Sequence, residues 1–143
     1  MKKILSTLLF GLVLFTTACS DSTLQTLAKA MPVIATANQG LFNIVTSAVQ
    51  SGVMTADEAR PIVQINQQVA QAGIQIDAAI KGETEVNAAQ KVTLLQQIAP
   101  VQASVTAIVS NLQIKDKTTK TTVLTALTTI NASLTAILAA LGK

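Results

Sequence analysis

Few side chains in this sequence could carry out chemistry. The 143-residue chain has no His, so it lacks the commonest general base and metal ligand. Its one pair of adjacent carboxylates is Asp57 and Glu58, and neighbours on a helix point about 100° apart. A Thr-x-x-Glu pattern from Thr55 to Glu58 indicates a capping box, which gives Glu58 a structural role. We therefore expect no catalytic residue, no metal site and no cofactor.

The sole cysteine, Cys19, follows a stretch that is typical of a secretory signal. Lys2 and Lys3 give a charged start, Ile4 to Phe15 an apolar run, and small residues precede the cysteine. The apolar run is too short for a permanent membrane span, which takes about 20 residues. We predict that residues 1–18 are a cleaved signal peptide and that the mature chain begins at Cys19.

The run ending in Ala18-Cys19 resembles the lipobox of bacterial lipoproteins. The resemblance covers residues 1–20 only, and it implies a diacylglycerol on Cys19 and an acylated N-terminus after cleavage. Thr16 stands where the class usually has leucine, so ordinary secretory cleavage after Ala18 is the alternative. In this class an aspartate directly after the cysteine favours the inner membrane, whereas Ser20 follows here. The resemblance thus implies an outer-membrane anchor facing the periplasm, with two or more acyl chains for stable attachment.

Charge argues against a nucleic-acid partner. Two of the ten basic residues lie in the predicted signal peptide, so the mature chain has eight basic and seven acidic residues. Lys115, Lys117 and Lys120 form the densest basic cluster. An anionic lipid surface or an acidic partner is one interpretation of this cluster, and a solvated connection between helices is the one we favour.

Apolar residues at alternating spacings of three and four predict four amphipathic helices. In chain order their stripes are Leu24, Leu27, Met31, Ile34, Asn38, Leu41, Val45, Ala48; Ile62, Ile65, Val69, Ala72, Ile76, Ala79; Leu94, Ile98, Val101, Val105, Ile108, Leu112; and Val123, Leu127, Ile130, Leu134, Ile137, Leu141. Four such helices with short breaks predict an all-α, up-down-up-down four-helix bundle. The first and third connections should share the end away from Cys19.

Prolines and caps set the expected boundaries. Pro32 disfavours helical geometry before it, so we expect residues 19–31 to be the lipidated N-terminus with a tether or short helix. The bundle would then span residues 32–143. We expect bends at Pro61 and Pro100, where the stripes keep their phase.

The remaining helix ends follow from cap residues. Gly52 should end the first helix in the left-handed conformation, and Thr55 should begin the second. We place the third N-cap at Thr84, with Glu85 in the first turn. The fourth should begin at Asp116 or Thr118.

Two features bear on function. Asn38 is the polar residue on the first stripe, and a buried asparagine fixes helix register, with ligand binding as the alternative. No charged residue occurs between Lys120 and Lys143, which would be compatible with a membrane-spanning helix. Threonines recur through that segment, however, and they argue against a membrane span.

The helix flanks are rich in Ala, Thr, Gln, Asn and Ser, whereas a solvated bundle usually carries more Glu and Lys. We therefore expect self-association or a helical protein partner, and a non-catalytic binding or structural role. The alternatives are a secreted bundle that inserts into a bilayer, as toxins and lysis proteins do, and a carrier of an apolar ligand in the bundle interior.

Overall fold

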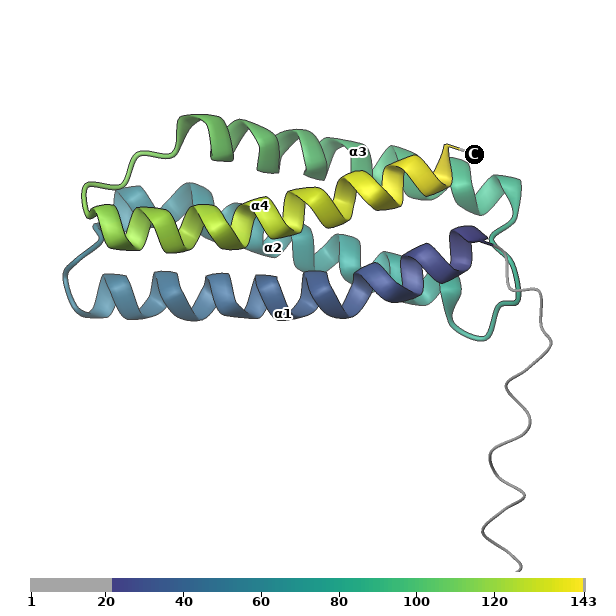
Figure 1. Cartoon of the computed structure of the whole chain (residues 1–143), viewed down its shortest axis with the longest axis horizontal. Helices are drawn as coiled ribbons and strands as arrows, with labels where there is room; N and C mark the ends of the chain where they lie inside the picture. The colour runs from purple at the N-terminus through teal and green to yellow at the C-terminus, as the bar shows by residue number, and fades with distance from the viewer. Residues whose placement is uncertain (1–21, 143) are drawn as a thin grey trace, which may run out of the picture.

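The computed structural model describes residues 22–142 as four α-helices joined by short connections (Figure 1). The helices are α1 (Ser22–Gln50), α2 (Ala56–Ile80), α3 (Ala88–Asn111) and α4 (Lys117–Leu141). Residues 22–142 contain no strand. The predicted signal peptide and Cys19 lie outside the described residues.

Consecutive helices run antiparallel, and α4 returns beside α1 (Figure 1). α1 packs most extensively against α4 and next against α2, whereas α2 and α3 share the smallest contact of the four neighbouring pairs. This is the predicted up-down-up-down helical bundle. The α1–α2 and α3–α4 connections share one end, while the α2–α3 connection lies at the other end with the start of α1 and the C-terminus.

The apolar stripes form the core. Most of the residues named above are buried, and all six of α4 are at most 2% exposed. In α3 only Leu94, Ile98 and Val105 are buried, so this helix presents more of its surface to solvent. Met54, Val86 and Ile114 add apolar side chains from the connections. Full burial of each Leu or Ile favours folding by about 1.5–3 kcal/mol, so the core provides the main driving force for the bundle.

Several connections follow the predicted local chemistry. Gly52 has φ = +73° after α1, as expected for a left-handed helix end. Thr55 caps α2 and forms a capping box with Glu58, and Asp116 caps α4 by accepting the N–H of Thr119 at 2.7 Å. Gly142 is the C-cap of α4.

Two helix starts differ from the prediction. α1 begins at Ser22 and passes through Pro32 without a break. Thr23 and Leu27 are buried, so the residues before Pro32 pack against the bundle as part of the same helix. α3 begins after Asn87, not at Thr84: the Asn87 side chain accepts the N–H of Gln90, whose side chain accepts the N–H of Asn87 (both 2.9 Å).

The prolines of α2 and α3 lie inside unbroken helices. α2 continues on both sides of Pro61, and α3 on both sides of Pro100. Each proline removes one backbone hydrogen bond, so the packing of the stripe on either side must hold these helices together.

The first turn of α1 is tied to the last turn of α4. The Thr23 hydroxyl donates a hydrogen bond to the carbonyl oxygen of Ala140 at 3.2 Å, across 117 positions of the chain. Thr23 is 2% exposed and is the buried polar residue of the bundle core. α1 is therefore part of the bundle from its second residue onward.

Candidate functional site

The carboxylates of Asp57 and Glu58 have separate structural partners. Asp57 forms an ion pair with Arg60 at 2.9 Å on the helix surface. Glu58 Oε2 accepts both the N–H and the hydroxyl of Thr55 at 2.8 Å, and Oε1 accepts the N–H of Lys115 at 3.0 Å. The bond from the Thr55 backbone, followed by the others, lowers the pKa of Glu58 below its ordinary 4.5. Glu58 thus joins the α1–α2 and α3–α4 connections at one end of the bundle.

The lysine cluster lies at the same end. Lys115 and Lys117 are exposed and Lys120 is partly buried at the start of α4. Within residues 22–142 the one ion pair that the structure contains is Asp57–Arg60, so these lysines make no ion pair with described groups. The hydrogen bond from the Thr119 backbone holds the pKa of the adjacent Asp116 carboxyl below its ordinary 3.8. The structure thus places these lysines at the α3–α4 connection and the start of α4, where the charge of Lys115 helps to lower the pKa of Glu58.

Asn38 pairs with an asparagine of α2. The Asn66 side chain donates to the Asn38 carbonyl oxygen at 2.7 Å and to Asn38 Oδ1 at 2.9 Å. The Asn38 side chain donates to the carbonyl oxygen of Asn66 at 3.1 Å. Both residues are partly buried, and their hydrogen bonds are satisfied by each other. The pair therefore suits the predicted register role better than ligand binding.

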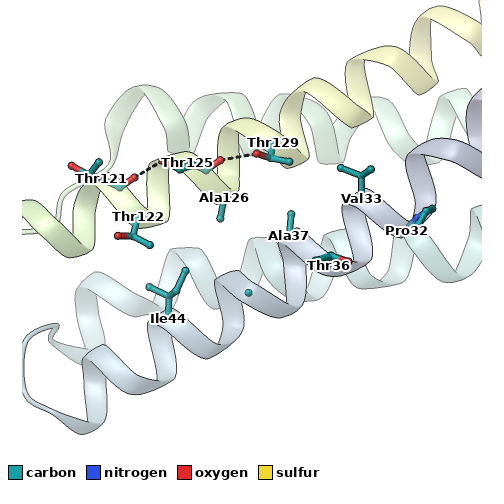
Figure 2. A pocket seen from close by; sticks show the side chains of 11 residues that line it. Pro32, Val33, Thr36, Ala37, Ile44, Thr121, Thr122, Thr125, Ala126 and Thr129 are labelled. Carbon is teal, nitrogen blue, oxygen red and sulfur yellow. Dashed lines mark hydrogen bonds between the residues drawn. The ribbon is translucent and has the colours of Figure 1, made fainter.

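A groove runs along the flank of the bundle between α1 and α4 (Figure 2). We call it the α1–α4 groove, and it has a volume of about 750 Å³. Its lining is Pro32, Val33, Thr36, Ala37, Gly40 and Ile44 of α1 with Thr121, Thr122, Thr125, Ala126 and Thr129 of α4. No charged residue occurs in this set. Its size falls in the range of roughly 300–1,000 Å³ that is usual for small-molecule sites.

The α4 threonines of the groove are bonded to their own helix. The hydroxyls of Thr121, Thr122, Thr125 and Thr129 donate to the carbonyl oxygen four residues earlier, at 2.9–3.0 Å. Two of these bonds appear in Figure 2 as a row along α4. A threonine whose O–H is used in this way presents its methyl group and one acceptor oxygen, with no hydrogen to donate. The groove wall is consequently more apolar than its sequence indicates.

A second hollow, between α2 and α3, has a different character. Its lining includes Gln64, Gln67, Gln68, Gln71, Gln75 and Gln97, with Ala72 and Val101. The volume is about 830 Å³. It follows the most weakly packed pair of helices, where long amides can adapt to many polar contacts. Nothing in this hollow selects one ligand chemistry.

The groove was not predicted from sequence. The apolar stripe of positions 123–141 does not include the threonines of α4, and the sequence predicts an apolar ligand in the bundle interior. The available signal was the i,i+4 series Thr121, Thr125 and Thr129, because hydroxyls at this spacing can bond back to the preceding turn. Asn66 was missed as the partner of Asn38, since pairing between helices depends on their relative height.

Two further observations complete the site. Among the residues that the structure describes, no group of three or more Asp, Glu, His or Cys could hold a metal ion. Cys19, the predicted lipidation site, lies outside this part of the chain. Comparisons with protein-family models, with curated proteins and with solved structures find no match.

Proposed function

We propose that this chain is a lipid-anchored lipoprotein of the bacterial outer membrane, facing the periplasm, with a non-catalytic binding or structural role. Residues 1–18 would be the signal peptide and Cys19 the acylated N-terminus. The partners in this proposal are the membrane, through the acyl chains, and a helical protein or a second copy of the chain. The small, uncharged residues of the helix flanks support such close helix contacts.

The lipobox-like run that ends at Ala18-Cys19 carries the proposal, and the start of α1 gives the anchor a structural consequence. Only Ser20 and Asp21 lie between Cys19 and Ser22, the first residue of α1. Because Thr23 and Leu27 are already packed in the bundle, acyl chains on Cys19 would hold this end of the bundle close to the bilayer. A lipid anchor would thus set the distance of the whole domain from the membrane.

This attachment would also orient the bundle. The helices have 24 to 29 residues, so at about 1.5 Å per residue the bundle is roughly 35–45 Å long. The lysine cluster and Glu58 lie at the end opposite Ser22 (Figure 1). An upright bundle would therefore present them to the periplasm, far from the bilayer that holds Cys19.

Intact mass spectrometry of protein from a bacterial membrane fraction tests the anchor. We expect a chain that begins at Cys19 and carries the added mass of acyl groups, absent from a Cys19→Ala variant made in parallel. An unmodified mass beginning at Cys19 would contradict acylation and support the secreted alternative.

A second candidate function is insertion into a bilayer, and one observation favours it. α3 and α4 are each long and apolar enough to cross a membrane. Only 17% of the most apolar 18-residue stretch of α3 is buried in the bundle. The packing of α4 against α1 opposes insertion, because those contacts would have to break. Release of a trapped dye from anionic liposomes would support insertion, and an intact dye signal over a wide range of concentrations would exclude it.

A further inference from the structure

We propose that the α1–α4 groove binds the single acyl chain of an anionic amphiphile, such as a fatty acid, with the head group at Lys29. This inference does not depend on acylation of Cys19, since the groove is formed entirely by residues 32–129. It places the apolar-ligand site on the flank of the bundle, outside the core.

The walls of the groove suit a hydrocarbon chain. Val33, Ala37 and Ile44 point from α1 toward α4, and Ala126 points back toward α1 (Figure 2). The hydroxyl hydrogens of the α4 threonines are already donated to carbonyl oxygens of their own helix, so these side chains do not need an acceptor on a ligand. An alkyl chain has no hydrogen-bonding group, and its binding would remove apolar surface of the groove from contact with water.

The dimensions also fit one chain. From Pro32 to Ile44 the groove follows α1 for twelve residues, or about 18 Å at 1.5 Å per residue. One leaflet contributes half of a hydrocarbon core of about 30 Å, so a membrane acyl chain extends over about 15 Å. The groove can thus hold the length of one chain.

A lysine flanks each end of the groove: Lys29 of α1 at the end near Pro32, and Lys117 of α4, four positions before Thr121, at the opposite end. We place the head group at Lys29. Lys29 is the only charged residue among the 29 residues of α1, and it is exposed. It lies three and four positions before Pro32 and Val33, which places it on the groove face one turn beyond the lining. It has no ion-pair partner among residues 22–142. A carboxylate or phosphate at this end would meet an unpaired ammonium group.

A protein partner fits the groove less well. Interfaces between proteins are usually anchored by aromatic side chains, and Phe42 is the one aromatic residue within the described range. Phe42 does not line the groove. It lies two positions from Gly40 and two from Ile44, and helix residues two apart face different directions. The groove lining offers small residues and no such anchor.

Photocrosslinking of the full chain tests the proposal. The wild-type full chain and a Cys19→Ala variant would each be purified and irradiated with a C16 fatty acid that carries a diazirine within the chain. We expect tandem mass spectrometry to place the label on residues 32–44 and 121–129. Palmitic acid should compete for labelling about two- to fivefold better than methyl palmitate, the advantage that an exposed ion pair gives.

Two variants distinguish binding in the groove from non-specific binding of the probe. An added Cβ at Gly40 meets no atom within 4 Å, so a side chain can begin at this position and Gly40→Leu should extend into the groove. An unchanged far-ultraviolet circular dichroism spectrum checks that the variant is folded. We expect the substitution to reduce labelling at least about tenfold, a large but measurable loss of affinity. Ala103→Leu, on an exposed position of α3, should leave labelling unchanged. Lys29→Gln should abolish the preference for the acid, and Lys29→Arg should keep it.

Three results would overturn the inference. Label spread evenly over the four helices would show non-specific partition of the probe. Labelling that survives Gly40→Leu would place the chain elsewhere. A wild-type dimer that Gly40→Leu converts to a monomer in sedimentation velocity would show that a second copy occupies the groove.

Discussion

The side chain of Asn66 donates hydrogen bonds to both oxygen atoms of Asn38, at 2.7 Å to the backbone carbonyl and 2.9 Å to Oδ1. The return bond from Asn38 to the Asn66 carbonyl makes the contact reciprocal. A shift of α1 against α2 by one turn would separate the two amides and leave polar groups without partners. The pair thus fixes the relative height of the two helices.

Replacement of either asparagine should destabilise the bundle. Asn38→Ala removes the acceptor Oδ1 and the bond that Asn38 donates, and Asn66→Ala removes both bonds that Asn66 donates. Two lost hydrogen bonds cost about 1–3 kcal/mol in either variant. The double variant should lose less than the sum, because the bond from Asn66 to Asn38 Oδ1 is lost in both single variants and is counted twice in their sum. Urea denaturation followed by circular dichroism measures these differences. Asn43→Ala removes only an exposed bond from Gln39 and should change stability little.

Stability should fall in acid through Glu58 and Asp116. Both carboxyls have a lower pKa in the folded chain than their ordinary values of 4.5 and 3.8. Their contribution is therefore complete above those values and is lost as the pH falls through the lower folded pKa. We expect the urea midpoint to decrease from neutral pH to below 4.

Glu58→Gln is the matched variant for this pH effect. A glutamine keeps the reciprocal capping geometry but does not ionise in this range. Its urea midpoint should vary less between pH 7 and pH 3 than that of the wild type, and Asp116→Asn should flatten the profile further. Equal pH dependence in all three proteins would assign acid sensitivity to other groups.

The glycines of α1 and its connection should respond in opposite directions to alanine. Gly40 lies inside a helix with open space at its Cβ position, so Gly40→Ala should stabilise by about 0.4–1 kcal/mol. Gly52 has φ = +73°, where alanine is strained, so Gly52→Ala should destabilise by about 1–2 kcal/mol. Thermal unfolding midpoints report both signs. A lower midpoint for Gly40→Ala would mean that the groove floor needs glycine.

Local chemistry predicted much of this fold. The stripes in positions 24–141 gave four helices because burial of one apolar face is the main reason that each forms. Gly52, Thr55 and Asp116 marked helix ends because left-handed backbone and side-chain capping depend on neighbouring residues only. The order of the helices followed from short connections.

Tertiary packing determined the start of α1, the start of α3 and the contacts between helices, which local sequence patterns do not predict. Pro32 suggested a helix start, but burial of Leu27 and Thr23 outweighs the lost backbone bond and extends α1 to Ser22. The connection before α3 buries Val86, and the cap then falls on Asn87. The Asn66 pairing and the α1–α4 groove both depend on where two helices meet, which no local pattern contains.

The placement of α1 has a mechanical consequence. If Cys19 is anchored and a partner pulls on the opposite end, tension enters at Ser22 and runs along the full 29 residues of α1. The neighbouring helices α4 and α2 would then be loaded in shear along their length, where many contacts yield together. Pro32, which lacks a backbone N–H, would be the point of α1 that stretches first. A pull on the C-terminus would instead peel α4 from α1 one turn at a time, beginning at the Thr23–Ala140 bond.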